Sequence, residues 1–271
     1  LFEPAHGTPP RPLTIIASAT GVPRGFYARF AEHLARHGRP ALTFDYRGIG
    51  GSLREPIIES TARFRDWGVI DTPGVLTWAA AHAEGRPIHW VGHSYGGFAL
   101  GLAHNGHIVD RLLGVATMTA DLRFVQSWRE RARIMALVSI GAPAIARVKG
   151  YVPGWLNGNS EDLPKGVALE WGRWVMTPQF LFGDHTLPER RHFTRVRAAI
   201  RFASMHDDTW LTDTGVRHLA GQFSNAAERS FWPVTLAEAK AERIGHIGFF
   251  RNAHAATLWP KALAWLDADP R

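Results

Sequence analysis

The chain has 271 residues, of which 45% are hydrophobic, and its formal net charge at pH 7 is +7. No apolar run reaches the roughly 20 residues that a membrane-spanning helix needs, so we expect no membrane span. The sequence has no cysteine, which excludes disulfides, cysteine nucleophiles and thiolate metal sites. The arginines are spread along the chain, so we expect no nucleic-acid partner despite the basic charge.

Size and composition are typical of a soluble globular enzyme. A chain of this length suits one large α/β domain with an inserted subdomain. The sequence, which starts at Leu1, shows no signal peptide headed by lysine or arginine, and the cytoplasm is the default compartment. The oligomeric state is left open.

Apolar runs and helical patterns alternate along the chain. Buried strands are predicted over residues 13–19, 41–45, 88–92, 112–118, 198–204 and 229–235. Helices are predicted over residues 26–37, 72–83, 97–103 and 258–266. This alternation predicts an α/β fold with a mostly parallel central sheet and helices on both faces.

The alternation breaks between about residues 120 and 197, a stretch too long for a simple connection. Four tryptophans lie in it, at Trp128, Trp155, Trp171 and Trp174. We interpret 120–197 as an inserted helical cap, and 1–119 together with 198–271 as the core. Such a cap would form a wall of an apolar acyl pocket; the alternative is a set of surface helices with no part in binding.

Between the strand over 88–92 and the helix that follows lies the stretch Gly92-His93-Ser94-Tyr95-Gly96-Gly97. A G-x-S-x-G pattern between a strand and a helix is typical of a nucleophile elbow, which holds a serine on a sharp turn above the sheet edge. An ordinary glycine-rich turn is the alternative, but the flanking elements favour Ser94 as a nucleophile. Ser139 lacks a small residue two positions earlier and is interpreted as structural.

Further motifs accompany this turn: TGVP at 20–23 with FY at 26–27, DYRGIGGS at 45–52, DDTW at 207–210 and GHIGFFR at 245–251. With these motifs the chain resembles the α/β-hydrolase superfamily along nearly its whole length, and in particular a little-characterised bacterial subgroup of predicted serine hydrolases. The loop at 19–23 lacks the common His-Gly dipeptide and is similar to a loop of the homoserine acetyltransferase-like branch. The resemblance implies an α/β-hydrolase fold.

The order Ser94, Asp208, His246 matches the superfamily's order of nucleophile, acid and base. A serine hydroxyl is a poor nucleophile at neutral pH, so a histidine must take its proton, and a carboxylate must orient that histidine. His246 follows a glycine on a late loop. His93 lies in the elbow itself, His218 in a predicted helix, and His254 runs into the last helix, so these three are poorer candidates for the base.

The acid has two adjacent candidates, Asp207 and Asp208, because only one of them can face the imidazole. Counting Met205 as the first loop residue favours Asp208, with Asp207 as a turn carboxylate that caps the following helix. Residues 180–184 also read as a strand that ends in an acid, Asp184, but they fall inside the predicted cap. We interpret Asp184 as cap structure.

Two backbone donors must face the negative charge that develops on the substrate oxygen. The amide of Tyr95 is the first candidate for this oxyanion hole. The second comes from the loop after the first strand, where alignment of the motifs favours Ala19 over Val22.

No phosphate-binding glycine pattern and no H-E-x-x-H occurs, so we expect no cofactor and no metal. The sequence therefore predicts a serine hydrolase that acts on a small-molecule acyl substrate. A carboxylic ester is the favoured class of substrate. An acyltransferase with the same three residues is one alternative, because the loop at 19–23 is similar to one in an acyltransferase branch. A non-catalytic ligand-binding member of the fold is the other.

Overall fold

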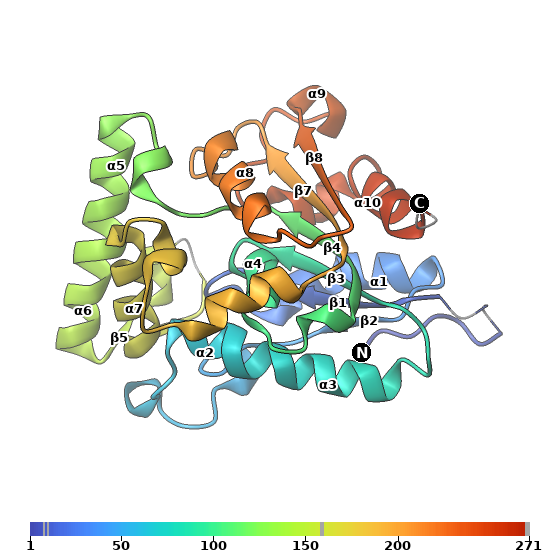
Figure 1. Cartoon of the computed structure of the whole chain (residues 1–271), viewed down its shortest axis with the longest axis horizontal. Helices are drawn as coiled ribbons and strands as arrows, with labels where there is room; N and C mark the ends of the chain where they lie inside the picture. The colour runs from blue at the N-terminus through green and yellow to red at the C-terminus, as the bar shows by residue number, and fades with distance from the viewer. Residues whose placement is uncertain (8, 10, 158–159, 269–271) are drawn as a thin grey trace.

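The computed structural model of the protein describes residues 1–7, 9, 11–157 and 160–268. Within them, six strands form one sheet in the order β2-β1-β3-β4-β7-β8, and every neighbouring pair runs parallel (Figure 1). These strands are β1 Leu13–Ala17, β2 Ala41–Thr43, β3 Ile88–His93, β4 Val109–Val115, β7 Ala199–Met205 and β8 Glu228–Val234. The predicted parallel sheet is confirmed.

Helices cover both faces of the sheet. The described helices are α1 Ala28–Arg36, α2 Phe64–Asp66, α3 Thr72–His82, α4 Tyr95–Leu102, α5 Trp128–Ile134, α6 Ala142–Lys149, α7 Lys165–Met176, α8 Asp213–Gln222, α9 Leu236–Ala239 and α10 Trp259–Asp267. One apolar cluster joins α1 and α10 to one face of the sheet, and a second joins α3, α4 and α8 to the other. None of these described helices combines the length and the apolar composition that crossing a membrane requires.

The central strands are apolar on both sides because both of their faces are covered. In β1, Ile15 packs into the cluster with α3 and α4, and Ile16 into the cluster with α1 and α10. Strand β4 lies three residues earlier than predicted. Ala116, with a φ of 52°, ends its extended conformation. At the other end of β4, Arg111 is buried and donates to the carbonyls of Trp265 and Ala268, a pairing that the apolar pattern does not reveal.

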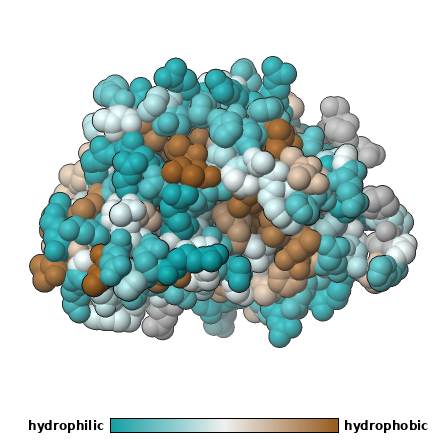
Figure 2. Space-filling view, turned by 90° about the horizontal axis from the view of Figure 1, so that it is seen from below, coloured by the Kyte–Doolittle hydropathy of each residue, from teal (hydrophilic) through white to brown (hydrophobic). Residues whose placement is uncertain are grey.

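The segment 120–197 folds as helices α5, α6 and α7 with a short antiparallel pair, β5 Tyr151–Val152 and β6 Leu163–Pro164. These helices gather at one end of the molecule, on the left of Figure 1. A stretch of π-helix, Met135–Gly141, joins α5 to α6 in one continuous helix, and α7 packs against it. Viewed from below, the surface is mainly hydrophilic, with separate hydrophobic patches that include some at this end (Figure 2). Residues 158–159 of the predicted cap lie outside the described residues.

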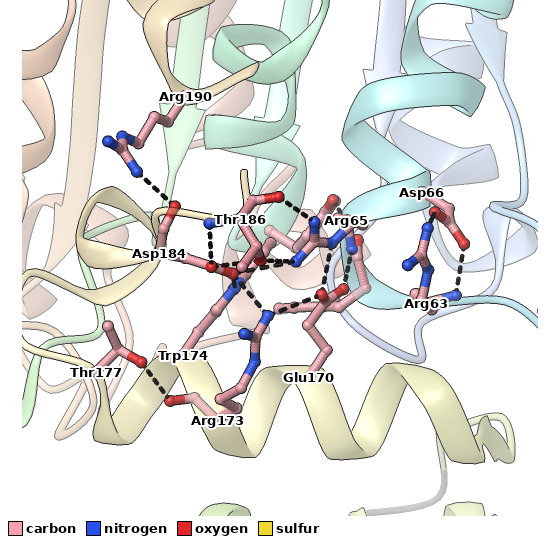
Figure 3. Close-up of polar contacts among 12 residues, drawn as sticks. Arg63, Arg65, Asp66, Glu170, Arg173, Trp174, Thr177, Asp184, Thr186 and Arg190 are labelled. Atoms are coloured by element: carbon pink, nitrogen blue, oxygen red, sulfur yellow. Dashed lines mark hydrogen bonds and ion pairs between the residues drawn. The ribbon is translucent and has the colours of Figure 1, made fainter. Parts of the chain in front are cut away.

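A network of ion pairs fastens these helices to the rest of the molecule (Figure 3). Arg65, on α2, donates from Nε to Glu170 on α7 over 2.6 Å and from a terminal nitrogen to Asp184 over 3.1 Å. Arg173 donates to Asp184 over 2.6 Å, and the indole of Trp174 donates to the same carboxylate over 2.9 Å. Burial alone would raise the pKa of Asp184, but hydrogen bonds and the charge of Arg173 outweigh it and lower the pKa. Asp184 follows a 3-10 helix, Phe180–Gly183, where the sequence had suggested a strand.

Strands β1 and β3 are neighbours at the centre of the sheet, and the chain leaves them in opposite directions. From β1 it crosses to β2, and from β3 to β4 on the other side. Where connections diverge in this way, the carboxyl ends of the strands border a crevice. The loop after β1 and the turn after β3 meet at this point, and the loops after β7 and β8 begin at the same edge of the sheet.

Candidate active site

Ser94 sits on a strained turn between β3 and α4. Its φ and ψ are 51° and −112°, a conformation that L-residues rarely adopt. Two glycines permit the turn by close backbone approach: a Cβ on Gly92 would lie 2.2 Å from the Gly96 carbonyl oxygen, and one on Gly96 would lie 2.3 Å from the Ala17 carbonyl oxygen. The Ser94 N–H donates to the carbonyl of Val115 over 2.8 Å, which fixes the turn against β4.

His246 lies between Ser94 and Asp208, although the three residues belong to distant parts of the chain. Its Nε2 is 3.0 Å from Ser94 Oγ, and its Nδ1 is 2.7 Å from Asp208 Oδ2. A carboxylate can only accept, so Nδ1 carries the proton and Nε2 is left to accept from the serine hydroxyl. The three side chains form one continuous series of hydrogen bonds, in the order expected from the sequence.

The neighbouring carboxylates, Asp207 and Asp208, face different partners. Asp208 bonds the imidazole and also accepts from the Trp210 N–H over 3.0 Å. Asp207 accepts from the backbone N–H of Ile244 over 2.8 Å and of Gly245 over 3.0 Å, so it holds the loop that carries His246. It does not cap the following helix as expected, because Thr212 caps α8. Burial alone would raise the pKa of Asp207, but backbone hydrogen bonds, chiefly these two, and the charge of Arg243 outweigh it and lower the pKa.

Exposure differs along this series of hydrogen bonds. The Asp208 side chain is 1% exposed, whereas the His246 side chain is 31% exposed and lines a cavity beside Ser94. The carboxylate is therefore shielded from water, and the imidazole can reach a bound molecule.

The Tyr95 amide belongs to the first residue of α4, where backbone N–H groups have no intrahelical acceptor and the helix end is electropositive. The loop after β1 was expected to offer a free backbone N–H, but both candidate N–H groups donate within the protein. The Ala19 N–H donates to the Tyr27 hydroxyl over 2.9 Å, and the Val22 N–H donates to the Ala19 carbonyl over 3.1 Å. Both candidates for the second oxyanion donor are thus engaged within the protein in this structure.

Two buried residues that the sequence analysis did not select lie behind this site. Tyr27 Oη is 2.7 Å from His93 Nδ1, and His93 Nε2 is 2.9 Å from the backbone carbonyl oxygen of His246. Burial, and next the charge of His246, lower the pKa of His93 to about 3. The motif contained His93, but only the fold reveals what it contacts.

The remaining histidine candidates have other places. His218 lies on α8 with Nδ1 3.0 Å from the Thr119 hydroxyl, and His254 is buried in a short 3-10 helix before α10. Within the described residues, no group of three or more His, Asp or Glu side chains is arranged to hold a metal ion.

A cavity of about 900 Å³ opens beside Ser94 and His246. Its walls are mainly apolar and come both from the segment 120–197 and from residues outside it. Residues outside the segment include Phe26, Phe98 and Met118. Residues within it include Ile134, Leu137 and Trp171. Two arginines, Arg133 and Arg251, also border it.

Comparison with known proteins matches residues 5–258 to the family described as the alpha/beta hydrolase family. No curated protein matches the sequence. A soluble variant of monoglyceride lipase from Saccharomyces cerevisiae is similar in structure, with a TM-score of 0.65, 14% identity and coverage of 98% of this chain and 89% of that one. An enol-lactonase from Burkholderia xenovorans is similar with a TM-score of 0.59 and 15% identity, over 98% of this chain and 94% of that one. A hydrolase from Pseudomonas aeruginosa is similar with a TM-score of 0.52 and 22% identity, over 95% of this chain and 91% of that one. At these identities the likeness establishes the fold.

Proposed function

Because the chain belongs to the alpha/beta hydrolase family, we propose that it is a serine hydrolase that cleaves carboxylic esters. Family membership supports hydrolysis in general. The observation that carries the more specific proposal is the series of hydrogen bonds from Asp208 through His246 to Ser94, with distances of 2.7 and 3.0 Å. The 3.0 Å between His246 Nε2 and Ser94 Oγ lies within the range over which a proton passes between a base and a nucleophile, and the 2.7 Å between His246 Nδ1 and Asp208 is a hydrogen bond that orients the base.

In the proposed reaction, Ser94 Oγ attacks the carbonyl carbon of the ester while His246 Nε2 takes the hydroxyl proton. The tetrahedral intermediate collapses, the bond to the leaving alcohol breaks, and the imidazolium returns its proton to the alcohol oxygen. A water molecule then attacks the acyl-enzyme, with His246 again accepting a proton, and releases the acid and free Ser94. Asp208 keeps the imidazole in the required tautomer and stabilises its positive charge.

The negative charge on the substrate oxygen would be stabilised by the Tyr95 amide at the start of α4. For Ala19 to serve as the second donor, its N–H must leave or share its bond to the Tyr27 hydroxyl. Tyr95 is therefore the donor that the geometry supports better.

We also propose that the segment 120–197 acts as a cap over a core formed by 1–119 and 198–271. Support comes from its position in the walls of the cavity, where Ile134, Leu137 and Trp171 face the same space as Ser94. A volume of about 900 Å³ with mainly apolar walls suits an ester with a sizeable apolar acyl group. The similarity in fold to a monoglyceride lipase agrees with an ester substrate.

The test is hydrolysis of p-nitrophenyl esters of increasing chain length, together with labelling by a fluorophosphonate probe. We expect the wild type to hydrolyse esters and to take up one probe per chain. Ser94→Ala should lower kcat by about 10⁴-fold or more and abolish labelling. Ser139→Ala is the matched control, because Ser139 lies in the π-helical stretch of the cap, and it should behave as wild type.

The outcomes separate the alternatives. Hydrolysis that gives way to ester exchange when alcohols are added would favour an acyltransferase. A wild-type protein that neither cleaves any ester nor takes up the probe would contradict an activated serine and favour the ligand-binding alternative.

A further inference from the structure

Behind the candidate site, Tyr27 and His93 connect two loops that are distant in sequence. Both side chains are completely buried. Ala19, on the loop after β1, donates its N–H to Tyr27 Oη over 2.9 Å, and Tyr27 Oη is 2.7 Å from His93 Nδ1. His93 Nε2 is 2.9 Å from the carbonyl oxygen of His246. The series thus begins at one loop of the site and ends at the residue that bears the proposed base.

The direction of every bond in this series is determined. The His246 carbonyl can only accept, so His93 Nε2 must carry the ring proton. A neutral His93 then offers Nδ1 as an acceptor, so the Tyr27 hydroxyl donates to it and accepts from Ala19. The ring of Phe250 lies 4.9 Å from that of Tyr27 and 5.1 Å from that of His93, so the series runs through an aromatic environment.

We propose that Tyr27 and His93 are positioning residues that hold the Ala19 loop and the His246 loop in register across Ser94. The proposal rests on the proposed function for its effect on rate. Tyr27→Phe would remove one hydroxyl and leave two buried polar groups, the Ala19 N–H and His93 Nδ1, without their partner. The loops could then shift, and displacements of about 1 Å near reacting groups can cost about 10²-fold in rate.

The first experiment compares kcat and KM of Tyr27→Phe with those of the wild type on a p-nitrophenyl ester. We expect kcat to fall about 10²-fold. KM should change less, because the Ala19 loop forms only part of the cavity wall and the rest of the lining keeps its place. Tyr46→Phe is the matched control: Tyr46 is also buried, and its hydroxyl has no hydrogen-bond partner among the described residues. Unchanged kcat in a folded Tyr27→Phe protein would overturn the proposal.

A second pair of variants covers the case in which Tyr27→Phe does not fold. His93→Gln keeps a donor and an acceptor, whereas His93→Leu keeps neither, so the glutamine variant should retain more kcat. Equal kcat in these two variants would overturn the proposal. Hydrogen exchange of the Ala19 amide provides a readout that needs no activity: it should quicken in Tyr27→Phe. If the wild type cleaves no ester but the exchange quickens, the proposed function fails and the tether between the loops stands.

A separate observation concerns the outer surface of the cap. From Trp128 to Lys149, α5, the π-helical stretch and α6 form one continuous helix. Every fourth residue along it is apolar and exposed: Trp128, Ala132, Ala136, Ile140, Ala144 and Val148. A spacing of four lies between the 3.6 residues of an α-turn and the wider π-turn, so these residues stay on one face. Trp128 is 72% exposed, Ile140 59% and Val148 87%.

Cations flank this face. Between residues 128 and 149 the helix carries five basic residues and one acid, Glu130, which pairs with Arg133. All five basic residues are exposed: Arg129, Arg131, Arg133, Arg147 and Lys149. The surface also continues into the cavity, because Leu137 is exposed and lines it, and Arg133 borders it.

We infer that this face binds an anionic lipid surface and brings the mouth of the cavity to it. An exposed apolar face with cations beside it fits the boundary between the headgroups and acyl chains of anionic lipids. A second copy of the chain is disfavoured as the partner, because the two cationic faces would repel each other.

The test is sedimentation of the full chain with phosphatidylcholine vesicles, with and without phosphatidylglycerol. We expect binding only to the anionic vesicles, weakened by high salt. Ile140→Glu combined with Val148→Glu should lower binding at least about tenfold. Ile70→Glu, at an exposed position of the core, should bind as wild type. No binding to anionic vesicles, or a wild-type dimer that the double substitution dissociates, would overturn the inference. Binding needs no ester hydrolysis, so it is tested separately from the proposed function.

Discussion

Two adjacent aspartates show how position decides the role of a side chain. Asp207 and Asp208 follow β7, and successive residues of the turn point in different directions. Asp208 faces the imidazole of His246, while Asp207 faces the backbone of Ile244 and Gly245. One carboxylate therefore orients the proposed base, and the other holds the loop on which that base is carried.

Substituting each aspartate separately should distinguish these roles. Asp208→Asn should lower kcat/KM by about 10⁴-fold, because an amide cannot stabilise the imidazolium and can select the wrong tautomer. Asp207→Asn keeps one acceptor, so we expect kcat/KM to fall less than about tenfold and the free energy of unfolding to fall by roughly 1–2 kcal/mol. Ester kinetics and urea unfolding of both variants measure this. A larger loss of activity in Asp207→Asn would reverse the assignment.

Two devices position the site at the scale of secondary-structure elements. The elbow between β3 and α4 depends on backbone contacts that only glycine permits at positions 92 and 96. The proposed cap depends on Arg65 of α2, whose guanidinium faces Glu170 and Asp184 from the segment 120–197. The first device could be read from sequence, because its residues are consecutive. The second could not, because its partners are more than 100 residues apart.

The ion pairs of Arg65 predict how firmly the proposed cap is held to the rest of the protein. The Arg65 side chain is 13% exposed, so Arg65→Met would leave two buried carboxylates with Arg173 as their remaining cation. We expect the free energy of unfolding to fall by about 3 kcal/mol and KM to rise as the wall of the cavity loosens. Arg63→Met is the matched control, because the Arg63 side chain, which pairs with Asp66, is 58% exposed. We expect this variant to lose less than about 1 kcal/mol of the free energy of unfolding. Urea unfolding measures both, and equal losses would show that the buried network does not hold the cap.

At the scale of the whole molecule, local patterns predicted the order of strands and helices, because apolar periodicity records which faces are buried. Together with the resemblance to the α/β-hydrolase superfamily, they also selected Ser94, His246 and Asp208, which the fold brings together. They did not predict the partners of Tyr27 or His93, since nothing local to residues 27 and 93 indicates that their side chains meet. The same holds for the Ala19 amide. The sequence predicted its place in the loop after the first strand, but not that it donates to the Tyr27 hydroxyl.

The same long-range packing buries His89 and His93, whose pKa values it lowers. Burial, and next the charges of Arg39 and Arg111, lower the pKa of His89 to about 3, and burial lowers that of His93 to about 3. Their ordinary pKa is 6.5. Between these values the unfolded chain binds more protons than the folded one, so stability rises with pH. The contribution is complete above about pH 6.5 and is lost as the pH falls toward 3.

We therefore expect the free energy of unfolding to fall between pH 7 and pH 5, by about 2 kcal/mol for each of these two histidines. Carboxylates with a lowered pKa, such as Asp184, lose their contribution to stability only below their ordinary pKa of 3.8. The change in stability between pH 7 and pH 5 therefore comes from histidines. His89→Gln removes one titrating group, and its loss over the same interval should be smaller than that of the wild type by about 2 kcal/mol. Urea unfolding of both proteins at the two pH values measures the difference. Equal losses of stability would mean that His89 accepts a proton in the folded state, although it is buried between β1 and β4.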